Sequence, residues 1–161
     1  MRTHFPTVHW DDVEVTFYAS PLPAGNDRPY AVVIFARHEE GFVLADIPGR
    51  GWITPSGRLE PGETPLQAAV RETREEIGTE PEDLTEIGYY TLVRPDGEVL
   101  EASAYVGYVR EYGNLYAGTE SRGTRLALLT ELPALYWRWD SLLEAMFEYA
   151  FKINIAAGSQ H

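Results

Sequence analysis

Cysteine is absent from this chain, so the sequence excludes disulfide bonds and thiolate metal sites. A run of about 18 apolar residues, the length of a membrane-spanning helix, is also missing. Residues 1–12 carry no apolar stretch of the kind that a signal peptide needs. We therefore expect a soluble protein of the reducing cytoplasm, without membrane association.

Basic residues are few relative to acidic ones, 13 against 25, and the formal net charge is −12. No cluster of Lys or Arg interrupts this negative field, so binding to nucleic-acid backbones is not expected. If the protein binds phosphate groups, a cation must screen its carboxylates. Clustered carboxylates together with Mg²⁺ hold polyphosphates that the carboxylates alone would repel.

The 161 residues, 44% of them hydrophobic, are enough to bury one core, and no repeat or linker divides the chain. We predict a single domain over residues 1–161. Gly41 and the segment 95–97 (Pro-Asp-Gly) are typical of turns between strands. Apolar runs and alternation predict strands over 13–19, 30–37, 42–47, 84–94, 98–109 and 124–129, with a short segment at 52–54.

Residues 64–77 form the clearest predicted helix. Thr64 and Gln67 match a capping box, Pro65 suits the first turn, and Gly78 ends the helix. A second helix is expected from a cap at Asp140 to about residue 155. Mixed strands with two helices predict an α/β sandwich.

Three glutamates follow the second half of the first helix at i, i+3 and i+4, namely Glu72, Glu75 and Glu76. Their carboxylates are expected to cluster and repel one another on the side opposite the buried face, and a divalent cation would remove that repulsion. The alternative is a solvated acidic surface paired with Arg71 and Arg74. The buried face is predicted to contain Leu66, Ala69, Val70, Thr73 and Ile77.

The 22 residues from Gly57 to Gly78 resemble the Nudix box, G-x5-E-x7-R-E-U-x-E-E-x-G-U, where U is aliphatic. The fixed positions match at Gly57, Glu63, Arg71, Glu72, Glu75, Glu76 and Gly78. Thr73 and Thr79 replace the aliphatic residues, which should affect packing more than chemistry. Ser56 replaces a glycine that commonly precedes the box.

This resemblance implies a Nudix-type α/β/α sandwich with a mixed β-sheet, one catalytic helix and a C-terminal helix. It implies Mg²⁺, with Mn²⁺ as an alternative, bound by Glu72, Glu75, Glu76 and the carbonyl of Ser56. A further carboxylate from a distant loop is expected to complete the site, and Glu120 is preferred to Glu101.

Catalytic roles also follow from the resemblance. Arg71 is expected to orient the glutamates. Glu75 is the preferred general base, with Glu72 and Glu63 as alternatives. Gly57 and Ser56 are expected to bring the backbone close to the substrate, and Arg50 and Arg58, with Arg37 as a further candidate, to reach its phosphates.

The implied function is hydrolysis of a phosphoanhydride bond in a nucleotide by a monomer or homodimer. The first choice, by similarity to MutT-like and YtkD-like enzymes, is cleavage of a normal or oxidised nucleoside triphosphate to the monophosphate and pyrophosphate. ADP-ribose or another nucleotide sugar is the runner-up, with Pro95 as its only hint, and a non-catalytic nucleotide sensor is the rival class. Candidate base-stacking residues are Phe17, Tyr18, Trp52, Tyr136, Trp137 and Trp139.

Overall fold

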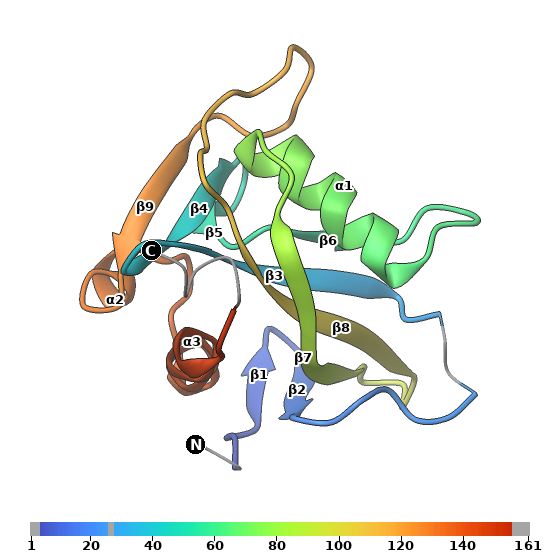
Figure 1. The fold of residues 1–161 in the computed structure, drawn as a ribbon. Coiled ribbons are helices and arrows are strands. Elements are labelled where there is room, and N and C mark those ends of the chain that lie inside the picture. The colour runs from blue at the N-terminus through green and yellow to red at the C-terminus, as the bar shows by residue number, and fades with distance from the viewer. Residues whose placement is uncertain (1–3, 26–27, 156–161) are drawn as a thin grey trace.

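The computed structural model describes residues 4–25 and 28–155 and contains a single mixed β-sheet with helices on both faces (Figure 1). Every strand predicted from the sequence is present, with bounds shifted by one or two residues. The strands are β1 (Val8–Trp10), β2 (Val13–Tyr18), β3 (Ala31–His38), β4 (Gly41–Ile47), β5 (Gly51–Ile53), β6 (Ser56–Arg58), β7 (Glu82–Val93), β8 (Val99–Tyr108) and β9 (Thr124–Leu128).

The sheet is ordered β1-β2-β7-β8-β3-β4-β5, with β6 paired to β3 and β9 paired to β4. The two expected hairpins are confirmed, because β3 pairs antiparallel with β4 and β7 pairs antiparallel with β8. β3 and β8 are parallel, which makes the sheet mixed. The strand β3 therefore lies in the middle of the molecule, bonded to β8 on one side and to β4 and β6 on the other.

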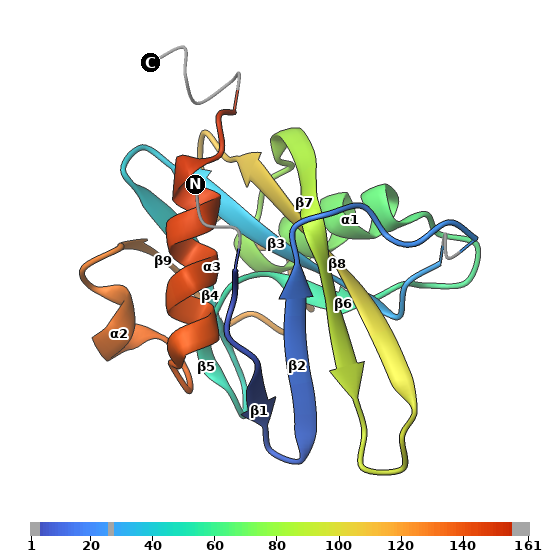
Figure 2. The same ribbon diagram turned by 90° about the horizontal axis from the view of Figure 1, so that it is seen from below.

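The alternation of side chains along β3 separates two hydrophobic layers. Val32 and Ile34 pack with Ala68 and Ala69 of helix α1 (Pro65–Ile77) on one face of the sheet. On the other face the ring of Phe35 lies 5.0 Å, centroid to centroid, from that of Phe147. Phe147 belongs to helix α3 (Ser141–Lys152). Figures 1 and 2 show α1 and α3 on opposite sides of the sheet, which confirms the predicted α/β/α arrangement.

Both long helices begin as predicted. The Thr64 hydroxyl accepts from the Gln67 amide and the Gln67 side chain accepts from the Thr64 amide, which completes the capping box. Asp140 caps α3 by accepting from the amide of Leu143. Helix α3 ends at Lys152, three residues before the end predicted from the sequence, because the chain becomes extended at Ile153.

The predicted buried face of α1 is wrong in two respects. Leu66 is 50% exposed, whereas Ala68 is fully buried. Glu72 and Glu76 are only 8% exposed, so they lie on the buried side of the helix and not opposite it. Thr73, which stands where the motif has an aliphatic residue, is fully buried. Its hydroxyl donates a hydrogen bond to the carbonyl of Ala69, so the substitution affects packing, as expected.

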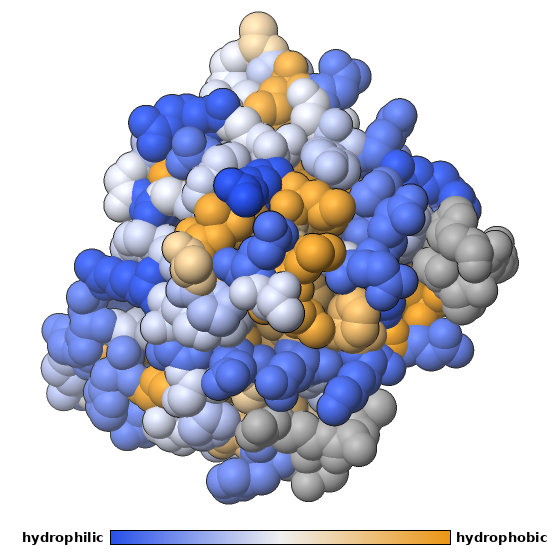
Figure 3. Space-filling view, turned by 90° about the vertical axis from the view of Figure 1, so that its left-hand side faces the viewer, coloured by the Kyte–Doolittle hydropathy of each residue, from blue (hydrophilic) through white to orange (hydrophobic). Residues whose placement is uncertain are grey.

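Three short elements were not predicted from the sequence, namely β1, β6 and the four-residue helix α2 (Leu132–Leu135). The face over β9 and α2 carries a central apolar area surrounded by hydrophilic residues (Figure 3). Leu128 of β9 is 42% exposed. Within the described ranges, no helix combines the length and apolar character needed to cross a membrane.

Candidate active site

The three predicted glutamates line one pocket of about 260 Å³ where the second half of α1 meets β6. The other lining residues come from the end of β4, the β4–β5 turn, β6 and the loop before β9. The full lining is Ile47, Arg50, Ser56, Gly57, Arg58, Glu72, Glu75, Glu76, Tyr116, Thr119 and Glu120. The structure thus brings together the preferred candidates for binding the cation and the phosphates, namely Glu72, Glu75, Glu76, Ser56, Glu120, Gly57, Arg50 and Arg58. Glu101 and Arg37 lie elsewhere.

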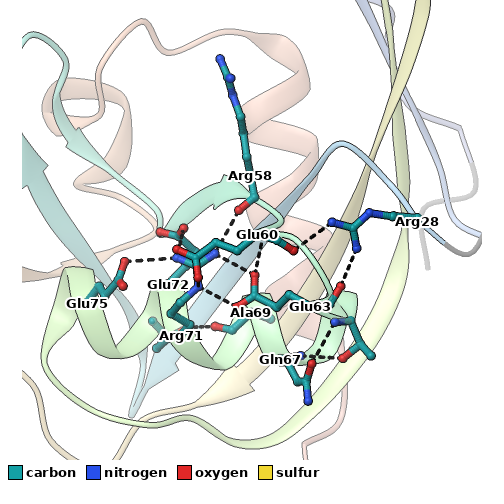
Figure 4. Close-up of polar contacts among 11 residues, drawn as sticks. Arg28, Arg58, Glu60, Glu63, Gln67, Ala69, Arg71, Glu72 and Glu75 are labelled. Carbon is teal, nitrogen blue, oxygen red and sulfur yellow. Dashed lines mark hydrogen bonds and ion pairs between the residues drawn. The ribbon is translucent and has the colours of Figure 1, made fainter.

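Arg71 lies at the centre of the acidic cluster (Figure 4) but is not among the residues that line the pocket. Its Nη1 contacts Glu72 Oε1 at 2.7 Å and Glu75 Oε2 at 3.3 Å. Its Nε contacts Glu63 Oε2 at 2.7 Å, and its Nη2 donates to Glu63 Oε1 and to the Arg58 carbonyl. One planar guanidinium therefore orients three carboxylates and one backbone oxygen, as a lysine ammonium could not.

Glu63 is fixed by hydrogen bonds to both of its carboxylate oxygens. Both of its oxygens accept from Arg71, and Oε1 also accepts from the Glu60 amide. The hydrogen bonds from Arg71 lower the pKa of the Glu63 carboxyl. Arg28, from the other side, donates to the carbonyls of Glu60 and Glu63 and fastens the loop before the helix (Figure 4).

Gly57 is required by the position of Glu72. A Cβ on residue 57 would lie 2.2 Å from Oε1 of Glu72, so any other residue here would force this carboxylate to move. The missing side chain lets the carboxylate rest against the backbone of β6. Burial raises the pKa of Glu72, while its ion pair with Arg71 opposes that shift.

Glu76 is the most strongly perturbed carboxylate of the site. Burial raises its pKa to about 8, against the hydrogen bond that its Oε1 accepts from the amide of Ser56 at 2.9 Å. The negative charges of Glu72 and Glu120 raise it further. Positive charge brought into this pocket would stabilise the ionised form.

Glu75 and Glu120 complete the pocket from two directions. The side chain of Glu75 is 34% exposed and has a long contact to Arg71, so it is more open to solvent than Glu63, Glu72 or Glu76. Glu120 comes from the 110–123 loop, which packs on the end of α1. Thr119 donates to the Glu75 carbonyl at 2.5 Å, and Gly113 donates to the Ile77 carbonyl at 2.8 Å.

The end of α1 explains the last glycine of the motif. Gly78 has a φ of 85° and caps the helix in the left-handed conformation. A Cβ there would also lie 2.7 Å from the backbone of Asn114. The glycine thus serves both the turn and the close approach of the loop that carries Glu120.

The sequence analysis did not identify two residues that line the acidic pocket, Tyr116 and Thr119, because no motif pointed to them.

The donor set fits a hard divalent cation. Carboxylate oxygens from Glu72, Glu75, Glu76 and Glu120 face one pocket, as Mg²⁺ and Mn²⁺ prefer. In the described part of the chain no three acidic or histidine side chains form a preformed metal cage. Two of these carboxylates, those of Glu72 and Glu75, accept hydrogen bonds from Arg71.

A second pocket of about 340 Å³ adjoins the acidic one, and the two share Arg50 and Ser56 in their walls. Of the predicted stacking residues, only Tyr136 and Trp137 line it. Phe17, Tyr18, Trp52 and Trp139 do not. The remaining lining residues are Trp10, Asp11, Val33, Phe35, Ile53, Thr54, Tyr90, Arg138 and Leu143.

Polar groups stand at the edge of this aromatic pocket. Arg138 Nη1 contacts Asp11 Oδ1 at 2.8 Å, and its guanidinium lies 4.5 Å above the ring of Trp137. Both charged residues have left-handed backbone, with φ of 53° and 58°. The pocket therefore offers aromatic faces together with one acidic and one basic group at its rim.

Arg37 and Pro95, two further candidates from the sequence, also lie outside both pockets. Arg37 is engaged on the α3 side, where Nη1 donates to the Ile153 carbonyl and the guanidinium lies 5.2 Å from the ring of Phe151. Pro95 belongs to the β7–β8 turn, which is closed by the hydrogen bond from the Arg94 amide to the Glu98 carbonyl. Pro95 therefore gives no support to the nucleotide-sugar alternative.

Comparison with known proteins gives a consistent result. The family model of the NUDIX domain matches residues 27–149. YtkD of Bacillus subtilis (strain 168), assigned as an 8-oxo-dGTP diphosphatase, is 26% identical over 129 residues, which cover 80% of this chain and 78% of that protein. The human 8-oxo-dGDP phosphatase NUDT18 is 35% identical over 99 residues, which cover 53% of this chain and 31% of that protein.

The fold is similar to that of solved structures. The crystal structure of the pyrophosphohydrolase BsRppH from Bacillus subtilis aligns with a TM-score of 0.71 at 21% identity, covering 87% of this chain and 89% of that one. A hydrolase from M. smegmatis, RenU, aligns with a TM-score of 0.60 at 20% identity, covering 80% and 89%.

Proposed function

This chain belongs to the Nudix family and is a hydrolase of nucleoside phosphates, and we propose that it cleaves a nucleoside triphosphate, normal or oxidised, to the monophosphate and pyrophosphate. The observation that carries the proposal is the pair of adjoining pockets. One is lined by the glutamates of the family motif, and the other by aromatic rings, with Arg50 and Ser56 common to both. This arrangement suits a ligand with phosphates at one end and a base at the other.

The proposed cofactor is Mg²⁺, with Mn²⁺ as an alternative. Glu72, Glu75 and Glu76 would hold it, together with the Ser56 carbonyl and Glu120. A cation so bound neutralises charge on the phosphate oxygens and lowers the pKa of an attacking water. Support comes from the burial of Glu76, which has no ion pair among the described residues, because burying its ionised form without a counter-charge is unfavourable.

We assign the general base to Glu75. Its carboxylate is the most exposed of the box glutamates and has one weak polar contact, so it is free to take a proton from water. Glu63 and Arg71 act as positioning residues, because Glu63 fixes the guanidinium that orients Glu72 and Glu75. Arg50 and Arg58, which line the acidic pocket without belonging to the carboxylate cluster, would contact phosphate oxygens.

The base is proposed to bind in the aromatic pocket, against Tyr136 and Trp137. The names of the relatives YtkD and NUDT18 make 8-oxoguanine nucleotides the first oxidised substrates to try. The rim residues Asp11 and Arg138 present an acceptor and a donor to the edge of a bound base.

The test is a substrate panel with Mg²⁺, in which wild type and Glu75→Gln are assayed on the four nucleoside triphosphates, 8-oxo-dGTP and ADP-ribose. Products are separated by chromatography to distinguish pyrophosphate from single phosphate release. We expect one triphosphate to be preferred and the variant to lose about 10²-fold or more in kcat.

Glu98→Gln is the matched control, because it removes an exposed glutamate on the distant β7–β8 hairpin. It should keep wild-type activity. If wild type hydrolysed no nucleoside triphosphate of the panel, the proposed substrate class would be wrong. Equal rates for Glu75→Gln and wild type would remove Glu75 from both of its roles.

A further inference from the structure

A separate cavity of about 300 Å³ lies on the α1 face of the sheet and shares no lining residue with the acidic or aromatic pocket. Its lining comes from three sources: the loop after β2, the first turn of α1, and strands β7 and β8. The residues are Pro21, Leu22, Pro23, Gly25, Pro65, Glu86, Ser103 and Tyr105. Figure 2 shows the chain after β2 running across towards the side of α1.

Ser103 is the first sign that this cavity is a binding site. The residue is completely buried, and its hydroxyl has no hydrogen-bond partner among the described residues. An unpaired buried hydroxyl is unfavourable and therefore uncommon in folded proteins. Because Ser103 lines the cavity, a ligand there can supply the missing partner.

Two more polar groups stand beside Ser103. Tyr105 follows two residues later on β8, so it faces the same side of the sheet, and Glu86 of β7 is its register partner. Within residues 4–25 and 28–155, no basic side chain forms an ion pair with Glu86, and burial raises the pKa of its carboxyl. The lining of the cavity thus combines the exposed carboxylate of Glu86 with the buried Ser103 hydroxyl, neither of which has an ion pair or hydrogen-bond partner among the described side chains.

The walls are apolar. Pro21, Leu22 and Pro23 cover one side and Pro65 another. A neighbouring cavity of about 270 Å³ shares Pro21 and Glu86 and continues past Gly88 to Tyr149 and Ile153. Glu86 therefore lines both cavities.

We propose that this cavity binds an aliphatic amine, whose ammonium group donates to the Glu86 carboxylate and the Ser103 hydroxyl. Its methylene chain would lie against Pro21, Leu22 and Pro23. The net charge of −12 favours the approach of a cation. One carboxylate is too few for a hard divalent metal ion, which needs several oxygen ligands.

The proposal is tested by titrating isotope-labelled full-length protein with n-butylamine and following the amide resonances by NMR. Saturating Mg²⁺ is present so that the acidic cluster of α1 is occupied. The amides of Leu22, Ser103 and Tyr105 should shift and saturate. Neutral n-butanol has the same carbon chain, and its affinity should be at least about tenfold lower than that of butylamine.

Three variants complete the test. Glu86→Gln should weaken butylamine binding by about tenfold or more, because it removes the negative charge that the ammonium group contacts. The fold should be unaffected, because Glu86 is exposed. Ser103→Ala should weaken binding too and keep the fold, because the hydroxyl has no partner to lose. Glu98→Gln is the control and should bind as wild type does.

Three results would overturn the proposal. Shifts confined to the amides of Gly57, Glu75 and Glu76 would place the amine in the acidic pocket. Equal affinity for butylamine and butanol would remove the role of charge. Identical affinities of Glu86→Gln and Glu98→Gln would remove Glu86 from the site. None of these results bears on the hydrolase activity, because the two sites share no residue.

Discussion

Gly57 allows the carboxylate of Glu72 to occupy the space where another residue would have its Cβ. We predict that Gly57→Ala displaces Glu72 and lowers kcat with Mg²⁺ by about tenfold or more, as loss of a supporting contact does at metal sites. Steady-state kinetics over a Mg²⁺ titration would measure the effect. Gly123→Ala is the control, because an added Cβ there meets open space at ordinary backbone angles.

If Gly57→Ala kept wild-type kinetics, Glu72 would have room that the structure does not provide, and its proposed place beside the cation would be wrong.

At the scale of single residues, the sequence motif identified the acidic cluster, but it misjudged the surroundings. The helical spacing correctly placed Glu72, Glu75 and Glu76 together. It could not reveal that β6 lies against that side of the helix and buries two of them, since that packing depends on the pairing of β6 with β3. Arg37 failed as a phosphate ligand because it contacts the segment after α3, far away in the sequence.

Among the secondary-structure elements, α1 is the one on which the site depends most. We predict that Thr64→Ala lowers the free energy of unfolding by about 1 kcal/mol, because the Gln67 amide loses its acceptor. Urea denaturation would measure the change. Thr64→Ser keeps the hydroxyl and should be close to wild type, and a loss of the same size in both variants would show that the cap is not responsible.

Elements with local signals were predictable, and elements that depend on distant partners were not. The turn residues and the apolar runs were sufficient for the β3–β4 and β7–β8 hairpins. β1 and β6 have three residues each and exist through pairing with β2 and β3. The 110–123 loop has no periodic pattern, so the candidacy of Glu120 came from family resemblance, and only the structure placed it in the pocket.

For the whole molecule, the buried carboxylate of Glu76 links stability to pH. Its pKa is about 8 in the folded protein against an ordinary value of 4.5, so between these values the folded state holds a proton that the unfolded state has released. The free energy of unfolding of the metal-free protein should therefore decrease as the pH rises from about 5 to about 8. Glu76→Gln should lack this component.

Urea unfolding at several pH values in the presence of a chelator would measure the difference between wild type and variant. At pH 8, Mg²⁺ should restore stability to wild type by about 2.7 kcal/mol at a hundredfold excess over Kd. A pH slope that is unchanged in Glu76→Gln would contradict the assignment of the effect to this residue.

The contacts of Arg71 have a consequence for how the protein matures. Its guanidinium already supplies an internal positive charge to Glu63, Glu72 and Glu75. A newly synthesised chain can consequently assemble its catalytic helix before any divalent ion is captured. If the proposed cation site is correct, binding of the ion would exchange one counter-charge for another on an already folded helix, and metal supply would then affect activity more than folding.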